Sequence, residues 1–150
     1  MAVYSMKKDY HTKAHFGMID VTSDFQQAVD EAVDAHDMKS GIITGFTTGG
    51  TAALTTLEFE PGIVTHDLKD AFNRLAPYRD EKGNVLYYHH HETRGDDNGS
   101  SHIKSAILSP FITIPFIDGK ITIGPWQNLT LVECDPRDRH REIVFQVMGE

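Results

Sequence analysis

The stretch that decides the fold class is FITIPFIDGKITIG, residues 111–124. Apolar and β-branched residues flank Asp118 and Gly119, and an Asp-Gly pair between two such runs is a strong signal for a two-residue β-hairpin. Two further β-rich runs follow, NLTLVEC (128–134) and REIVFQVMG (141–149), and the charged turn DPRDRH joins them. The last third of the chain therefore predicts antiparallel strands.

The earlier part of the chain adds helical patterns to this β-rich sequence. In the first of them Ser23 is the expected N-cap, and Gln26, three residues later, completes a capping box. Helices are expected over residues 22–38, 64–77 and 101–108, and extended segments over 11–21, 41–46 and 51–56. Because strands dominate, the sequence predicts a single compact α+β domain over residues 1–150, antiparallel and β-rich with two to three helices.

Composition excludes several classes of protein. The chain has 150 residues and a formal net charge of −8, which argues against a general nucleic-acid binder with its basic patch. No stretch approaches the ~18 apolar residues of a membrane span. Cys134 is the only cysteine, so no intrachain disulfide can form, and its alternating context predicts a semi-buried strand residue. We expect a cytoplasmic protein with neither nucleic-acid nor membrane partners.

The segment richest in titratable and metal-competent side chains is YYHHHETRGDDNGSSHIKSAI, residues 87–107. Imidazole is the commonest transition-metal ligand and the usual acid–base group near neutral pH. On an extended chain His90 would point opposite to His89 and His91, so at most two of the three could face one pocket. His102 lies at the start of a predicted helix, where free N–H groups suit a phosphate or carboxylate. Neither HExxH nor CxxC is present, so a catalytic or metal site and an acidic surface loop both fit these residues.

Acidic and glycine-rich positions form a second group of candidates. Glu58 lies in an apolar and Thr-rich run, whereas Asp67 is in the first turn of a predicted helix, where acids usually serve the helix dipole. Gly49 and Gly50 would let the backbone approach a ligand closely. Glu133 lies on a mostly apolar strand face and needs a partner, which could be an arginine, a metal or another subunit, unless the strand is an exposed edge.

The arginines of the following turn are a third feature. They could bind a phosphate group, but in an acidic protein a solvated turn is the expected arrangement. These arginines are Arg137, Arg139 and Arg141.

Four blocks in order carry a resemblance to a known family. They are GGTAALTTLEFEPG (49–62), DDNGSSHIKSAILSP (96–110), IDGKITIGPWQNLTLVECD (117–135) and VFQVMGE (144–150). From about residue 12 to Glu150 the chain resembles the YjbQ-like family, also called the secondary thiamine-phosphate synthase family. The resemblance implies a compact α+β fold, a homotrimer and a polar pocket within or between subunits. It also implies a weak thiamine-phosphate synthase activity, which joins a pyrimidine diphosphate to a thiazole phosphate and releases pyrophosphate.

Matching the family's motifs residue by residue gives the expected site. The family's Tyr-x-His falls on Tyr88 and His90, and its helix-start aspartate on Asp67. The residues expected in catalysis are Glu58, Asp97, His102 and Lys104. Those expected to bind substrate are Gly50, Thr51, Asn98, Trp126 and Gln127. Those expected to bind a metal are His90, His91 and His102.

The expected chemistry has three alternatives. In a synthase, Lys104, the N–H groups of residues 98–102 and Mg²⁺ on Asp97 or Glu58 would compensate the charge of the leaving pyrophosphate, and His102 would protonate it. In a metal-dependent hydrolase, histidines would hold Zn²⁺ and Glu58 would act as base. The third alternative is a non-catalytic trimeric ligand-binding protein. Many family members have His-Thr-Thr-Ala where this chain has Gly49-Gly50-Thr51-Ala52, so any histidine ligand at position 49 is lost.

Overall fold

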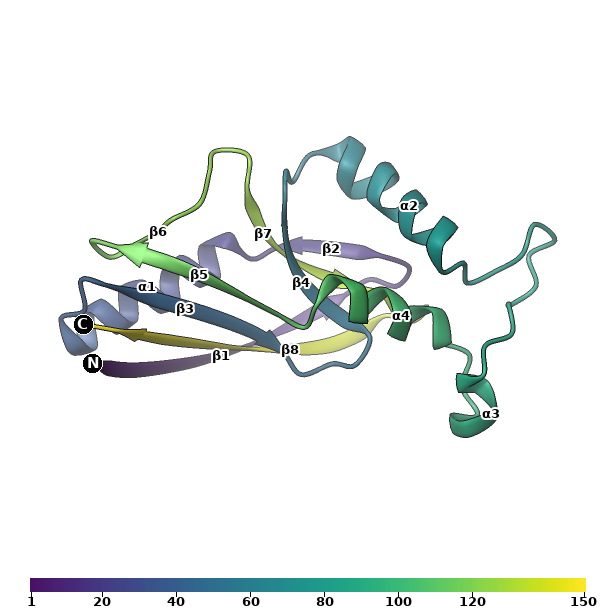
Figure 1. The fold of residues 1–150 in the computed structure, drawn as a ribbon, viewed down its shortest axis with the longest axis horizontal. Helices are drawn as coiled ribbons and strands as arrows, with labels where there is room; N and C mark the ends of the chain where they lie inside the picture. Colours follow the sequence, from purple (N-terminus) through teal and green to yellow (C-terminus); the bar gives the residue numbers. More distant parts are fainter.

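The structure, a computed structural model, describes residues 1–150 and confirms an α+β fold with antiparallel strands (Figure 1). The larger sheet runs in the order β1 (Ala2–Thr12), β8 (Arg139–Gly149), β3 (Ser40–Thr47), β5 (Phe111–Ile117) and β6 (Lys120–Ile121). The smaller sheet runs in the order β2 (Gly17–Asp20), β7 (Asn128–Glu133) and β4 (Ala52–Leu57). The helices are α1 (Thr22–His36), α2 (Leu68–Leu75), which continues the π-helical turn η1 (Ile63–Asp67), α3 (His90–Arg94) and α4 (Gly99–Leu108). No helix is both long and apolar enough to span a bilayer.

The predicted hairpin is present, with a shorter second strand than expected. Asp118 and Gly119 both have positive φ, 50° and 71°, as a two-residue turn with a right-handed strand twist requires. β5 pairs along its whole length with β3, whereas β6 pairs with β5 through only two residues. The hairpin therefore extends the larger sheet from β3 toward its edge.

The first strand was mispredicted. Residues 11–21 are not one strand, because β1 ends at Thr12 and β2 begins only at Gly17. Between them His15 and Phe16 have positive φ, 57° and 72°, which breaks the extended chain. β1 was not predicted from the sequence because it is an edge strand whose exposed side carries charged residues. Charged side chains commonly protect a sheet edge from pairing with other chains. Its whole register is set by pairing with β8.

Helix α1 covers one face of the larger sheet and closes the main core. The fully buried Phe25 ring meets Phe145 edge-on, with their centroids 5.0 Å apart. The predicted Ser23 cap is wrong, because the helix begins at Thr22 and Asp20 Oδ1 accepts the Thr22 N–H at 2.9 Å. The Gln26 side chain instead bonds Gly119 O and Ile121 N of the hairpin, which ties the helix to the sheet.

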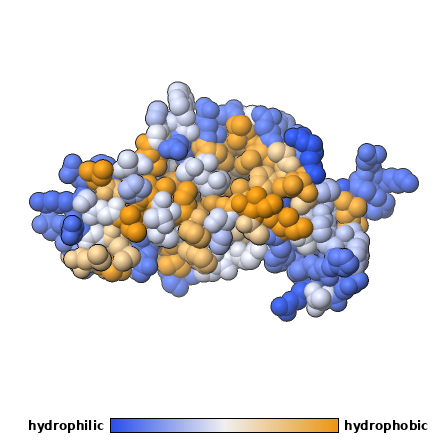
Figure 2. Space-filling view, viewed as in Figure 1, coloured by the Kyte–Doolittle hydropathy of each residue, from blue (hydrophilic) through white to orange (hydrophobic).

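The opposite face of the larger sheet carries apolar side chains that remain exposed. Ile42, Phe46, Phe111 and Ile117 are between 43% and 59% exposed. Figure 2 shows hydrophobic residues gathered over β3, β5 and α4 on the face toward the viewer. We call this surface the exposed sheet face. The segment that leads from α2 through α3 projects away from both sheets (Figure 1).

Candidate functional site

Three segments that are far apart in sequence meet at the start of α4. They are the entry to β4, the segment before α4, and the turn after β7. A side chain at Gly99 would place its Cβ 2.6 Å from Tyr88 Cβ, so only glycine lets the chain at Tyr88 cross the first helical turn. This close approach brings the projecting segment against α4 and places His90 at the site.

His90 and His102 form the central pair, with ring centroids 4.6 Å apart. His102 Cε1 lies 3.4 Å from where a Cβ on Gly50 would be, so the Gly50 backbone borders the ring. Burial, followed by the nearby His90, lowers the pKa of His102 below its ordinary value. His102 is therefore a neutral imidazole at pH 7, able both to accept a proton and to donate one N–H.

Of the three histidines predicted to bind a metal, His91 does not join this pair. Residues 90–94 are helical, so the expectation that an extended chain alternates these side chains is wrong. His89 is exposed, and the His91 ring lies 5.9 Å from Tyr88 and 6.1 Å from Tyr87. No three His, Cys, Asp or Glu side chains are arranged to hold a metal ion. His90 is the member of the triple that faces His102.

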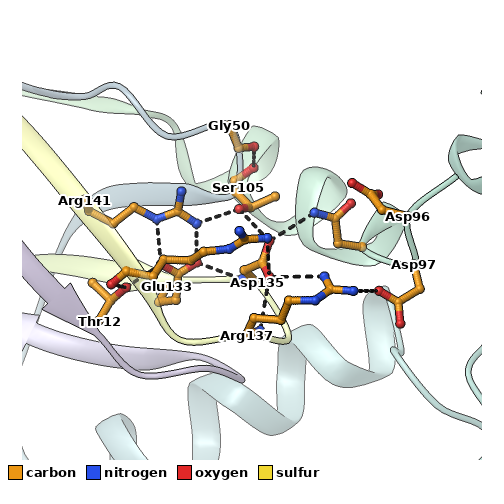
Figure 3. A network of polar contacts seen from close by, with 12 residues as sticks. Thr12, Gly50, Asp96, Asp97, Ser105, Glu133, Asp135, Arg137 and Arg141 are labelled. Carbon is orange, nitrogen blue, oxygen red and sulfur yellow. Dashed lines mark hydrogen bonds and ion pairs between the residues drawn. The ribbon is translucent and has the colours of Figure 1, made fainter. Parts of the chain in front are cut away.

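A hydrogen-bonded network centred on Asp135, a residue not predicted from the sequence, joins the three segments (Figure 3). Asp135 is fully buried and accepts hydrogen bonds from Thr51 Oγ1 and Asn98 Nδ2 at 3.0 Å each, and from Arg139 Nη2 at 3.1 Å. Burial opposes its ionisation, but these hydrogen bonds outweigh burial and lower the pKa of Asp135. Thr51 and Asn98, expected to bind substrate, thus have side chains that bond a buried carboxylate.

Asp97 joins the projecting segment to this network. Its carboxylate accepts a hydrogen bond from Tyr78 Oη at 2.8 Å and pairs with Arg137. The Tyr78 hydrogen bond, together with Arg137, lowers the pKa of Asp97. Asp97 is consequently an ionised, half-exposed carboxylate at the entrance to the site.

The buried Glu133 is paired with an arginine, one of the partners that its position required. Arg141 donates to it through Nε and Nη2, each at 2.6 Å, and Thr12 Oγ1 donates at 2.6 Å (Figure 3). The expectation of a solvated arginine turn is wrong, because Arg139 and Arg141 fold back onto the buried carboxylates Asp135 and Glu133.

This arginine also accounts for the glycine at position 49. A Cβ on Gly49 would lie 2.5 Å from Arg141 Nη1, so the guanidinium of Arg141 occupies the space that a side chain there would need. The glycine at position 49 therefore leaves the space in which Arg141 reaches Glu133.

The first turn of α4 also lines a cavity of about 410 Å³. Lys104 is buried there, and its Nζ donates to Asn73 Oδ1 at 2.7 Å. Burial lowers the pKa of the Lys104 ammonium. The lining residues are His15, Lys69, Asn73, Pro77, Tyr78, Arg79, Ser100, Ser101, Lys104, Cys134 and Pro136. We call it the basic cavity.

Four predicted residues lie away from this region within one chain. Glu58 is exposed just beyond the far end of β4, about 20 Å along the strand from its start near Gly50. Trp126, 71% exposed, and Gln127 lie in the β6–β7 connection, which Figure 1 places far from α3. Asp67 is exposed at the end of η1.

The sequence matches a family model described as UPF0047 protein YjbQ-like over residues 7–150. The chain belongs to the YjbQ-like family. It is 32% identical over 127 residues to a UPF0047 protein of Synechocystis, covering 84% of this chain and 82% of that protein. It is 28% identical over 124 residues to the UPF0047 protein YjbQ of Escherichia coli O157:H7, covering 83% and 85%.

Solved structures agree with this YjbQ-like assignment. One of them is a YbjQ-like protein of unknown function from Sulfolobus solfataricus. It superimposes on this chain with a TM-score of 0.82 at 29% identity, covering 99% of both chains. A Clostridium acetobutylicum protein of the YjbQ/UPF0047 family gives 0.78 at 26% identity, covering 95% of this chain and 99% of that one.

Proposed function

We propose that this YjbQ-like protein is a small-molecule enzyme with a phosphorylated substrate and a reaction of the thiamine-phosphate synthase type. The observation that carries the proposal is the His90–His102 pair beside the first turn of α4. A neutral imidazole, half withdrawn from solvent and bordered by backbone rather than by a competing side chain, is suited to acid–base work. The family resemblance supports the proposal, because His102 is one of the residues on which its motifs fall.

The reaction exchanges one bond for another at a methylene carbon. The thiazole nitrogen forms a C–N bond, while the C–O bond to the diphosphate breaks and its electron pair leaves with the oxygen. His102 donates its ring N–H to that oxygen, which offsets part of the developing charge. Asp97 and its ion pair with Arg137 border the entrance and would orient the substrate.

In the proposed function, a metal ion would bind together with the substrate. Zn²⁺ held by all three predicted histidines does not fit the observed arrangement, since His91 packs on tyrosine rings instead of joining His90 and His102. Mg²⁺ prefers phosphate oxygens and a few carboxylates, so it would accompany a diphosphate and take Asp97 as its protein ligand. Its requirement is measured by adding a chelator to the assay.

We also propose that the protein works as a homotrimer. The exposed sheet face is the surface that a second copy would cover, because large apolar side chains from two paired strands lie exposed on it. Trp126 and Gln127, distant from His102 in one chain, would then be contributed by a neighbouring subunit. The same applies to Glu58.

The experiment is a coupled assay for thiamine phosphate and pyrophosphate, supplied with hydroxymethylpyrimidine diphosphate, thiazole phosphate and Mg²⁺. His102→Gln should lower turnover by about 100-fold or more, the usual contribution of a general acid–base group. His89→Gln is the matched control, because His89 lies in the same histidine run but is exposed and outside the pair. Undiminished turnover in His102→Gln, or none in the unmodified protein, would reject this function.

A further inference from the structure

We propose that the basic cavity binds the phosphate or diphosphate group of the substrate. Four of its lining residues are cationic or can become so: His15, Lys69, Arg79 and Lys104. None of the eleven lining residues is a carboxylate, although the chain has 22 acidic residues and a net charge of −8. The inference rests on the proposed function for its substrate, but the anion site is argued from the cavity alone.

The cations of the cavity lack ionic partners within the chain. Lys69, Arg79 and Lys104 form no salt bridge, whereas Lys8 and Lys13 elsewhere are each paired with an aspartate. The hydrogen bonds that Lys104 and Arg79 do make go to uncharged oxygens, Asn73 Oδ1 and the Gly83 carbonyl. Three unpaired cations around one cavity leave a positive field that an anion would neutralise.

The positive charges around the cavity affect the pKa of the His15 imidazole. The pKa of His15 is lowered first by burial and then by Lys69, Arg79 and Lys104, with Asp135 opposing them. Repulsion of this kind among cations is relieved when an anion binds between them.

The acidic groups nearest the cavity are already compensated by other residues. Asp135 is satisfied by Thr51, Asn98 and Arg139. Asp97 is satisfied by Arg137 and Tyr78. Neither carboxylate is therefore free to neutralise the lysines and arginine of the basic cavity.

A second, independent observation points to a ligand. Ser100 in the first turn of α4 lines the cavity, is only 1% exposed, and its Oγ has no hydrogen-bond partner. A buried hydroxyl without a partner costs free energy unless something fills that role. The first-turn N–H groups of a helix add donors that favour negative charge, so a phosphate oxygen would satisfy Ser100 at no new cost.

The cavity and the proposed acid–base group lie on different sides of α4. Ser100, Ser101 and Lys104 line the cavity, whereas His102 does not line it and borders Gly50 from another side of the helix. An anion held by Lys69, Arg79 and Ser100 would therefore lie across the first turn of α4 from His102.

The test is isothermal titration calorimetry at low salt, in which inorganic phosphate or pyrophosphate is added to the purified protein and the dissociation constant of each anion is measured. We expect pyrophosphate to bind more tightly than phosphate, and Lys69→Met or Arg79→Met to weaken it about tenfold or more, as loss of a charge-assisted hydrogen bond implies. Both side chains reach solvent, so the fold should survive their replacement. Lys120→Met, on the β5–β6 hairpin, is the matched control and should bind as the unmodified protein does.

The outcomes separate this inference from the proposed function. His102→Gln should keep pyrophosphate binding while losing turnover. Failure of the synthase assay with intact, Lys69-dependent pyrophosphate binding would reject the reaction and keep the anion site. No binding of either anion at millimolar concentration would overturn the anion site, as would equal weakening in Lys120→Met and Lys69→Met.

Discussion

Replacing Arg141 by methionine should destabilise the protein strongly, and the structure allows the size to be worked out. The guanidinium makes two hydrogen bonds of 2.6 Å to Glu133 and one of 2.7 Å to Thr51 Oγ1. Glu133 is fully buried and the Arg141 side chain is only 10% exposed, so water cannot replace the lost partner. Breaking a buried pair by removing one member costs about 3–5 kcal/mol, and we expect the free energy of unfolding to fall by that amount.

The assay is equilibrium urea unfolding at one fixed protein concentration, because assembly would make stability depend on concentration. Glu133→Gln combined with Arg141→Met should be milder than Arg141→Met alone, since the uncompensated charge is then absent. Arg137→Met is the control, because its partner Asp97 is 38% exposed and the pair should contribute less than about 1 kcal/mol. A loss below about 1 kcal/mol for Arg141→Met would refute the reasoning.

Three further predictions concern packing, pH and assembly. Gly99→Ala would set a Cβ against Tyr88 and should cost about 1–3 kcal/mol in urea unfolding, whereas no loss would show that the crossing at Tyr88 is loose. The pKa values of His15 and His102 are lowered in the folded state, so the unfolded chain binds more protons below its ordinary histidine pKa of about 6.5. Stability from this source should be complete above that pH and be lost as the pH falls toward the lowered pKa values; a flat profile from pH 7.5 to 5 would contradict it. Phe46→Glu on the exposed sheet face should yield monomers in light scattering, whereas an equally assembled variant would exclude that face as the interface.

Local signals allowed much of the fold to be predicted. The Asp118-Gly119 turn is specified by its own two residues, which is why the hairpin was found. Strand β1 was missed because an edge strand takes its register from β8, and its charges resemble those of a loop. Ser23 was chosen as a cap from spacing alone, whereas the helix starts one residue earlier, with Val21 at the N-cap position and Asp20 Oδ1 accepting the Thr22 N–H.

The site was only partly predictable, for a different reason. The position of His102 near a helix start was predicted and is observed, and the arginine that partners Glu133 was one of several options. Asp135 was missed because burial of a turn carboxylate depends on Thr51 and Asn98, which are distant in sequence. The basic cavity could not be foreseen, since His15 and Lys69 meet Lys104 only in the folded chain.

The anion site in the basic cavity is tested directly by a crystal structure of the protein with pyrophosphate. We expect a diphosphate in the basic cavity, with oxygens in hydrogen-bond contact with Lys69, Arg79 and Ser100 Oγ. A diphosphate bound elsewhere while this cavity holds only water would contradict this expectation.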